Sequence, residues 1–211
     1  MDKYILWDHD GVLVDTEYWY FKSTQLPLSE LGISLDKSIY LEFMAQGRSC
    51  WDLVREAGIE PATLESKRID RDSYYQEHLI KEDIEIPGVL DVLKKLSKTH
   101  SMAIVTTSKR SDFDLIHRDK AIVPFMDFVI TREDYVLSKP APEPYLLGLS
   151  KFGAEAKNSI VIEDSQRGLQ SAIAAGINCA IVHNEFTSSH DFSGAKYRVN
   201  SISELPEAIG A

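Results

Sequence analysis

Five short, mainly apolar runs recur along the chain, and each ends in polar residues. They cover positions 4–7, 102–105, 127–130, 159–162 and 178–182. Runs of this length bounded by polar residues are typical of buried β-strands. Between the later runs, apolar residues recur at helical spacing, for example over 143–152 and 166–175. Strands that alternate with helices predict an α/β fold: a Rossmann-like parallel sheet with helices on both faces.

The segment 16–86 differs from the rest of the chain. It is rich in helix-forming residues and contains no convincing strand, and the dipeptide Pro87-Gly88 marks its end. The sequence therefore predicts two domains. Residues 1–15 and 87–211 form the α/β core, and residues 16–86 form a small all-helical cap that is inserted after the first strand.

The composition is that of an ordinary globular protein, with 44% hydrophobic and 27% charged residues among 211. There are 33 Asp and Glu residues against 23 Lys and Arg, a net charge of −10. Nucleic acids and anionic membranes require a basic surface, so neither is expected as a partner. The start of the chain lacks the pattern of a signal peptide, and no stretch approaches the roughly 20 apolar residues of a spanning helix. We therefore expect a cytoplasmic protein. The sequence does not determine the oligomeric state and is compatible with a monomer.

Residues that can carry chemistry follow the predicted strands. Asp8 and Asp10 come after the first strand, Thr106 after the second, and Glu163 with Asp164 after the fourth. Ligands of open parallel sheets bind at the carboxyl ends of the strands. These side chains are therefore expected to share one site.

The aspartates after the first strand have more than one interpretation. They can be turn-forming residues of a solvated loop. A calcium-binding EF-hand loop is excluded, because the positions that would need an oxygen ligand, a glycine and a glutamate hold Val12, Leu13 and Trp19. The chemical interpretation is a carboxylate nucleophile that forms a covalent intermediate, with a second carboxyl group two residues away as general acid and base.

These motifs resemble those of the haloacid dehalogenase (HAD) superfamily. The segment 8–15, DHDGVLVD, has the family form DxDGxxxD, and Thr106 and Lys139 stand where the family has a hydroxyl residue and a lysine. The segment 163–168, EDSQRG, is similar to the EDSxxG form of the branch that contains β-phosphoglucomutase and phosphoglycolate phosphatase. The resemblance extends over nearly the whole chain and implies phosphoryl transfer by an enzyme.

The resemblance implies a role for each matched residue. Asp8 would take up the phosphoryl group as an aspartyl-phosphate, and Asp10 would be the general acid and base. Thr106 would donate a hydrogen bond to a phosphoryl oxygen. Lys139 would neutralise negative charge on the phosphoryl group and on Asp8.

The same resemblance implies a Mg²⁺ site. Asp8 and Asp164 would provide carboxylate ligands and Asp10 its backbone carbonyl, while Glu163 would be a ligand or support one. Mg²⁺ favours one or two carboxylates together with water and substrate phosphate. With Lys139, the ion would remove the repulsion between Asp8 and the phosphate. Capping of the helix that begins near Ser165 is a second role for Asp164 or Ser165.

The cap would close over the site as a lid and provide specificity. Trp19 and Phe43 either contact the substrate or belong to the core of the cap. The six histidines show no metal-ligand spacing, and His9, between the two aspartates, is expected to point away from the site. Substrate contacts are expected from two core residues and three cap residues: Gly11, Thr107, Tyr20, Gln46 and Arg48.

Several activities fit the family resemblance. Dehalogenases lack the acid and base at the position of Asp10 and need no Mg²⁺, so phosphate chemistry is favoured. Close mutases carry a histidine at the position of Tyr20. They also carry a basic residue in the cap, and Arg48 lies in a different register from it. We therefore expect a phosphatase that acts on a small phosphorylated metabolite, such as a sugar phosphate. A mutase of the β-phosphoglucomutase type is the first alternative, and a non-catalytic binding or regulatory protein is the second.

Overall fold

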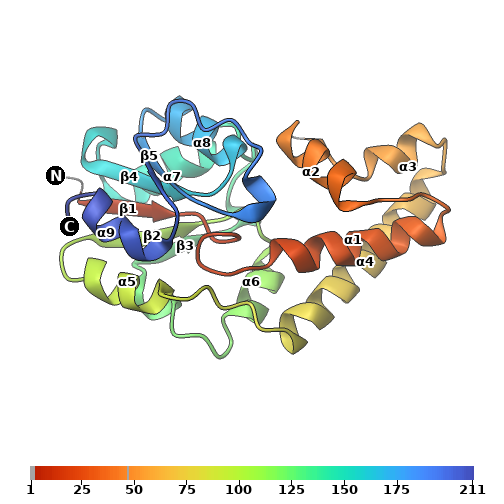
Figure 1. Cartoon of the computed structure of the whole chain (residues 1–211), viewed down its shortest axis with the longest axis horizontal. Coiled ribbons are helices and arrows are strands. Elements are labelled where there is room, and N and C mark those ends of the chain that lie inside the picture. The colour runs from red at the N-terminus through yellow and green to blue at the C-terminus, as the bar shows by residue number, and fades with distance from the viewer. Residues whose placement is uncertain (1–2, 47) are drawn as a thin grey trace. The chain divides into compact units, whose positions relative to one another are not determined.

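The computed structural model describes residues 3–46 and 48–211. The chain forms two compact units: Met1–Asp15 with Glu85–Ala211, and Thr16–Ile84. The first unit contains the sheet (Figure 1). Glu85 belongs to this unit and forms an antiparallel bridge with Val14, next to the point where the chain leaves the sheet.

The sheet has six strands, all parallel, in the order β3-β2-β1-β4-β5-β6. The expected α/β fold is therefore confirmed, and the sixth strand is an addition at the edge of the sheet. The strands are β1 (Tyr4–Trp7), β2 (Ser101–Val105), β3 (Phe128–Ile130), β4 (Ser159–Glu163), β5 (Asn178–Val182) and β6 (Tyr197–Val199).

Helices cover both faces of the sheet. On one face, α7 (Glu143–Phe152) packs on β1 and β2, and α8 (Gln166–Ala174) packs on β4 and β5. Connections between parallel strands are right-handed. The chain runs toward β3 through α5 (Val89–Leu96) and α6 (Arg110–Ile116), and later toward β6, so α5 and α6 lie on the opposite face. The last helix, α9 (Leu205–Ala208), packs against α5.

The backbone ladder continues one residue beyond two central strands. The N–H of Asp8 donates to the carbonyl of Ile162 at 2.8 Å, and the N–H of Thr106 donates to the carbonyl of Ile130 at 3.0 Å. The residues that follow β1 and β2 are therefore fixed by the sheet itself. Short 3₁₀ helices occupy several connections: η1 (Val123–Phe125), η2 (Arg132–Asp134), η3 (Ala156–Asn158), η4 (Glu185–Thr187) and η5 (Ile202–Glu204).

Among the described residues of the second unit, 16–46 and 48–84, helices are the only regular secondary structure. It contains α1 (Glu17–Glu30), α2 (Lys37–Ala45), α3 (Asp52–Glu56) and α4 (Pro61–Lys81), and α1 packs along α4. Over the described part of the chain, every helix is too short or too polar to cross a membrane.

Candidate active site

Lys139 lies at the centre of a buried network of charged side chains. Its Nζ donates to Asp8 Oδ1 at 2.7 Å, to Glu163 Oε1 at 2.8 Å and to the carbonyl of Val105 at 3.0 Å. The Lys139 side chain is only 2% exposed. Burial by itself would lower the pKa of Lys139, but the two carboxylates outweigh it and raise that pKa above its usual range. Lys139 is therefore a fixed positive charge at the carboxyl end of the sheet.

Glu163 is fully buried, and both of its carboxylate oxygens accept hydrogen bonds. Besides Lys139, Oε1 accepts from the hydroxyl of Tyr145 at 2.8 Å. Oε2 accepts from the N–H of Asp164 at 3.2 Å and from the N–H and hydroxyl of Ser165 at 3.2 and 2.9 Å. Burial opposes ionisation, yet Lys139 and these donors lower the pKa of Glu163. Glu163 is therefore an anion whose oxygens are committed to protein donors.

The start of α8 is built around this carboxylate. Ser165 is the N-cap of the helix, since its hydroxyl accepts a hydrogen bond from the N–H of Gly168 at 3.2 Å. A Cβ atom on Gly168 would lie 1.8 Å from Glu163 Oε1. The glycine of the EDSxxG segment therefore makes room for the buried glutamate.

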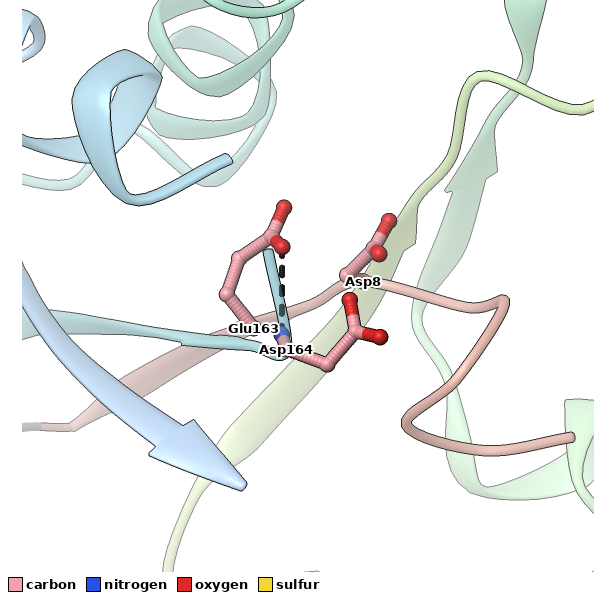
Figure 2. Close-up of side chains that lie close together, drawn as sticks. All are labelled: Asp8, Glu163 and Asp164. Atoms are coloured by element: carbon pink, nitrogen blue, oxygen red, sulfur yellow. Dashed lines mark hydrogen bonds between the residues drawn. The ribbon is translucent and has the colours of Figure 1, made fainter. Parts of the chain in front are cut away.

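Three carboxylates meet at the carboxyl ends of β1 and β4. Oxygen atoms of Asp8, Glu163 and Asp164 lie within 4.8 Å of one another, and Figure 2 shows the three side chains together. Hard oxygen donors of this kind suit Mg²⁺ or Ca²⁺. Burial and the charge of Glu163 raise the pKa of Asp8 to about 6, although Lys139 acts in the opposite direction. The cluster therefore has more negative charge than one lysine compensates, and it could hold a divalent metal ion.

Gly11 forms one wall of this cluster. Its φ is +83°, which favours glycine, and a Cβ atom there would lie 2.2 Å from Asp164 Oδ2 and 2.6 Å from Asn184 Nδ2. The Asn184 amide donates to the carbonyl of Gly11 at 3.5 Å. The backbone at Gly11 therefore approaches Asp164 more closely than any residue with a side chain would permit.

Asp10 is held by donors from the end of β2. Its Oδ2 accepts from the Ser108 hydroxyl at 2.5 Å and from the Thr106 hydroxyl at 3.3 Å. Thr106 Oγ1 in turn accepts from the N–H of Ser108 at 2.9 Å. Thr107, between them, is half-buried. In this structure the Thr106 hydroxyl therefore orients Asp10.

The expectation that His9 points away from the site is wrong. His9 Nδ1 lies 3.2 Å from Asp10 Oδ2, and His9 Nε2 lies 2.8 Å from His117 Nε2. In a strand, every second side chain lies on the opposite face, and His9 stands between the two aspartates in sequence. The strand ends at Trp7, however, and the turn that follows brings the His9 ring alongside Asp10.

The predicted substrate contacts of the second unit have partners inside that unit. The Arg48 guanidinium donates to Glu56 Oε1 at 2.6 Å and lies 4.2 Å from the ring centroid of Phe43. The Gln46 amide donates to Glu42 Oε1 at 3.0 Å.

The three aromatic residues considered for substrate contact lie in different surroundings. The ring of Tyr20 lies 4.5 Å from the guanidinium of Arg71. Trp19 stacks on His78 at 4.9 Å, whereas Phe43 is buried and belongs to the core of the unit.

Some residues of the network were missed by the sequence interpretation. Ser108 ends the hydroxyl run that follows β2, and this run is the signal that could have revealed it. Tyr145 lies on an apolar helix face and is indistinguishable from an ordinary core aromatic by sequence. Asn184 follows β5 at the same edge of the sheet as the other site residues.

Comparison with known proteins identifies the family. Residues 5–182 match the model of the haloacid dehalogenase-like hydrolases, so the chain belongs to this family and the expected enzyme class is confirmed. Protein CbbY of Cereibacter sphaeroides is 27% identical over 223 aligned positions, which cover 100% of this chain and 96% of that protein. The phosphorylated carbohydrates phosphatase of Thermotoga maritima is 29% identical over 189 positions, covering 85% of each.

Solved structures agree on the fold. The crystal structure of a CbbY variant from Rhodobacter sphaeroides in complex with xylulose 1,5-bisphosphate superimposes with a TM-score of 0.84 at 21% identity. The superposition covers 97% of this chain and 96% of the other.

Proposed function

We propose that the protein is a Mg²⁺-dependent phosphatase that hydrolyses small phosphorylated metabolites through an aspartyl-phosphate on Asp8. One observation carries the proposal. The Asp8 carboxylate is hydrogen-bonded to the buried Lys139 and lies in the acidic cluster with Asp164, and a second carboxyl group follows two residues later at Asp10. A site that only binds phosphate would not need these carboxylate groups, because they repel the phosphate anion.

The first half of the reaction transfers the phosphoryl group to Asp8. Lys139 donates to Oδ1, so Oδ2 is the oxygen that attacks phosphorus. A bond forms between Asp8 Oδ2 and phosphorus, and the bond from phosphorus to the leaving oxygen breaks. Asp10, acting as general acid, gives its proton to that leaving oxygen.

The second half returns the enzyme to its starting state. Asp10, now a carboxylate, accepts a proton from a water molecule that attacks phosphorus. The bond to Asp8 Oδ2 breaks and inorganic phosphate leaves. Because Asp10 is held by Thr106 and Ser108, both proton transfers use one oriented carboxyl group. General acid and base catalysis of this kind contributes about 10²- to 10⁴-fold in rate.

The charges of the site decide which residues would hold the metal ion. Asp8 and Asp164 would provide carboxylate ligands, with the backbone carbonyl of Asp10 beside them. Glu163 would hold neighbouring residues of the site in place, because its oxygens accept hydrogen bonds from Lys139, Tyr145 and Ser165 at the start of α8. When bound, Mg²⁺ would supply the positive charge that lets an anionic substrate approach an anionic nucleophile.

The substrate class is inferred from the relatives and from the helical unit. One relative is named a phosphorylated carbohydrates phosphatase, and CbbY has been solved with xylulose 1,5-bisphosphate. We infer a sugar phosphate or a similar small organic phosphate as substrate. The Thr16–Ile84 unit would act as a lid and exclude water, with Tyr20, Gln46 and Arg48 as specificity residues and Gly11 and Thr107 as contacts in the core.

The test is phosphate release from p-nitrophenyl phosphate and a panel of sugar phosphates, with Mg²⁺ and with EDTA. Wild-type protein is expected to turn over only with Mg²⁺. Asp8→Asn is expected to lose at least about 10³-fold, whereas Asp91→Asn, a matched change at an exposed carboxylate of the same unit, stays at the wild-type rate. Absence of turnover on the whole panel, or turnover in EDTA, would contradict the proposal. With β-glucose 1-phosphate, free glucose and phosphate support hydrolysis, and glucose 6-phosphate supports the mutase.

A further inference from the structure

Three side chains form a hydrogen-bonded chain that ends on Asp10. His9 lies between Asp8 and Asp10 in sequence and is fully buried. Its two ring nitrogens face different partners: Nδ1 lies 3.2 Å from Asp10 Oδ2, and Nε2 lies 2.8 Å from His117 Nε2. His117 is the C-cap of α6. These hydrogen bonds therefore connect the end of β1 to the end of a helix, between residues that are 108 positions apart in the sequence.

The contact between the two imidazoles requires one Nε2 to donate and the other to accept. His117 Nδ1 is buried and has no hydrogen-bond partner among the residues that the structure describes. A proton on that atom would be a buried donor without an acceptor, and such N–H groups are rarer than unsatisfied acceptors. The proton of His117 is therefore on Nε2, where it is donated to His9.

This arrangement fixes the proton of His9 as well. His9 Nε2 accepts from His117, so the His9 proton is on Nδ1, and Nδ1 donates to Asp10 Oδ2. The ring of Phe113 lies 5.1 Å from the His9 ring and 4.4 Å from the His117 ring, measured between centroids, and packs beside both. Burial and the neighbouring His9 lower the pKa of His117 to about 3, which agrees with a neutral imidazole that carries one proton.

We propose that His9 is a positioning residue for Asp10, with His117 fixing its tautomer. The inference rests on the proposed role of Asp10 as general acid and base. Hydroxyls of Ser108 and Thr106 contact the same oxygen, but a hydroxyl can rotate and can also accept, whereas the Nδ1–H of His9 only donates. Because Oδ2 accepts from His9, the catalytic proton of Asp10 is carried by Oδ1.

The activity test compares two leaving groups. An alkyl phosphate depends on protonation of its leaving oxygen, whereas p-nitrophenyl phosphate has a good leaving group. His9→Leu removes the donor, and His9→Asn restores an N–H bonded to Cγ, as Nδ1 is. For His9→Leu we expect kcat/KM to fall about 10- to 100-fold on the alkyl phosphate and less than about 3-fold on p-nitrophenyl phosphate. His9→Asn is expected to recover most of the alkyl activity.

Equal losses on both substrates, or no loss, would overturn the proposal. If His9→Leu does not fold, His117 gives the same comparison. His117→Leu removes the donor to His9 and His117→Gln retains an N–H near its position, so the alkyl-selective loss is expected for leucine alone.

Nitrogen NMR of histidine-labelled wild-type protein separates this inference from the proposed function. The expected result is a proton on Nδ1 of His9 and on Nε2 of His117. The opposite tautomers would overturn the positioning role even in an active enzyme. If the tautomers are as expected but the protein has no phosphatase activity, the proposed function is wrong. The hydrogen bonds from His117 to His9 and from His9 to Asp10 then have no catalytic role.

Discussion

Gly168 and Glu163 are in such close contact that a Cβ atom on the glycine would lie 1.8 Å from Glu163 Oε1. The same oxygen accepts from Lys139 Nζ at 2.8 Å. A glycine in the first turn of α8 therefore determines where the buried glutamate lies, and the glutamate helps to hold the lysine that contacts Asp8. The glycine therefore acts on Asp8, the proposed nucleophile, through the side chains of Glu163 and Lys139.

Gly168→Ala is therefore expected to destabilise the protein. In an ordinary helix interior this change stabilises by about 1 kcal/mol. Here the methyl group displaces the Glu163 carboxylate from Lys139, and disruption of a buried ion pair costs about 3–5 kcal/mol. Urea denaturation measures the difference. Gln170→Ala, at an exposed position of the same helix, is the control and is expected to change stability by less than about 0.5 kcal/mol. A Gly168→Ala protein as stable as wild type would show that Glu163 has another position available.

Gly11→Ala tests the proposed metal site. A Cβ atom at Gly11 would lie 2.2 Å from Asp164 Oδ2, so the carboxylate must move. We expect the affinity for Mg²⁺ to fall by about 10- to 100-fold, measured by calorimetry or by the Mg²⁺ dependence of turnover. Gly32→Ala is the matched control, since its φ of +74° carries the same backbone cost but nothing lies within 4 Å of the added atom. Equal affinities in both variants would place the metal away from Asp164.

Asp8→Asn is expected to stabilise the metal-free protein above pH 6. Burial and Glu163 raise the pKa of Asp8 to about 6 in the folded protein, against about 3.9 in the unfolded chain. At pH values between these two pKa values, Asp8 is largely protonated in the folded state and largely ionised in the unfolded state. Asp8 therefore lowers the free energy of unfolding as the pH rises through this range. At pH 7.5 in EDTA the variant is expected to be about 3 kcal/mol more stable, and at pH 4 the difference should be small.

Addition of Mg²⁺ provides the second half of this test. The ion is expected to raise the melting temperature of wild-type protein more than that of Asp8→Asn, because the variant lacks one ligand charge. A variant that is less stable than wild type in EDTA at pH 7.5 would contradict the raised pKa. Asp91→Asn, the same change at an exposed position, is the control variant for both measurements.

Much of the fold and of the site could be predicted from the sequence because both depend on short segments. Asp8, Thr106 and Glu163 occupy the ends of buried apolar strands, and parallel strands bring those ends to one edge of the sheet. The strand β6 escaped prediction because it has only three residues and its central Arg198 is exposed.

The partners within the site were harder to predict, because they are distant in the chain. Asp10 accepts from Ser108, 98 positions away, and His9 contacts His117, 108 positions away. No local pattern links such residues. The role of Gly168 was equally hidden, because a sequence motif gives the spacing of a glycine but not the atom that its missing side chain would meet.

Acid quenching during turnover is the direct test of whether Asp8 takes up the phosphoryl group. Wild-type protein with Mg²⁺ and a ³²P-labelled substrate is stopped in acid at millisecond intervals, and the labelled peptide is identified by mass spectrometry. We predict a label on Asp8 that hydroxylamine releases, that disappears on a chase with unlabelled substrate and that is absent from Asp8→Asn. A label on another residue, or normal turnover by Asp8→Asn, would show that Asp8 is not the nucleophile.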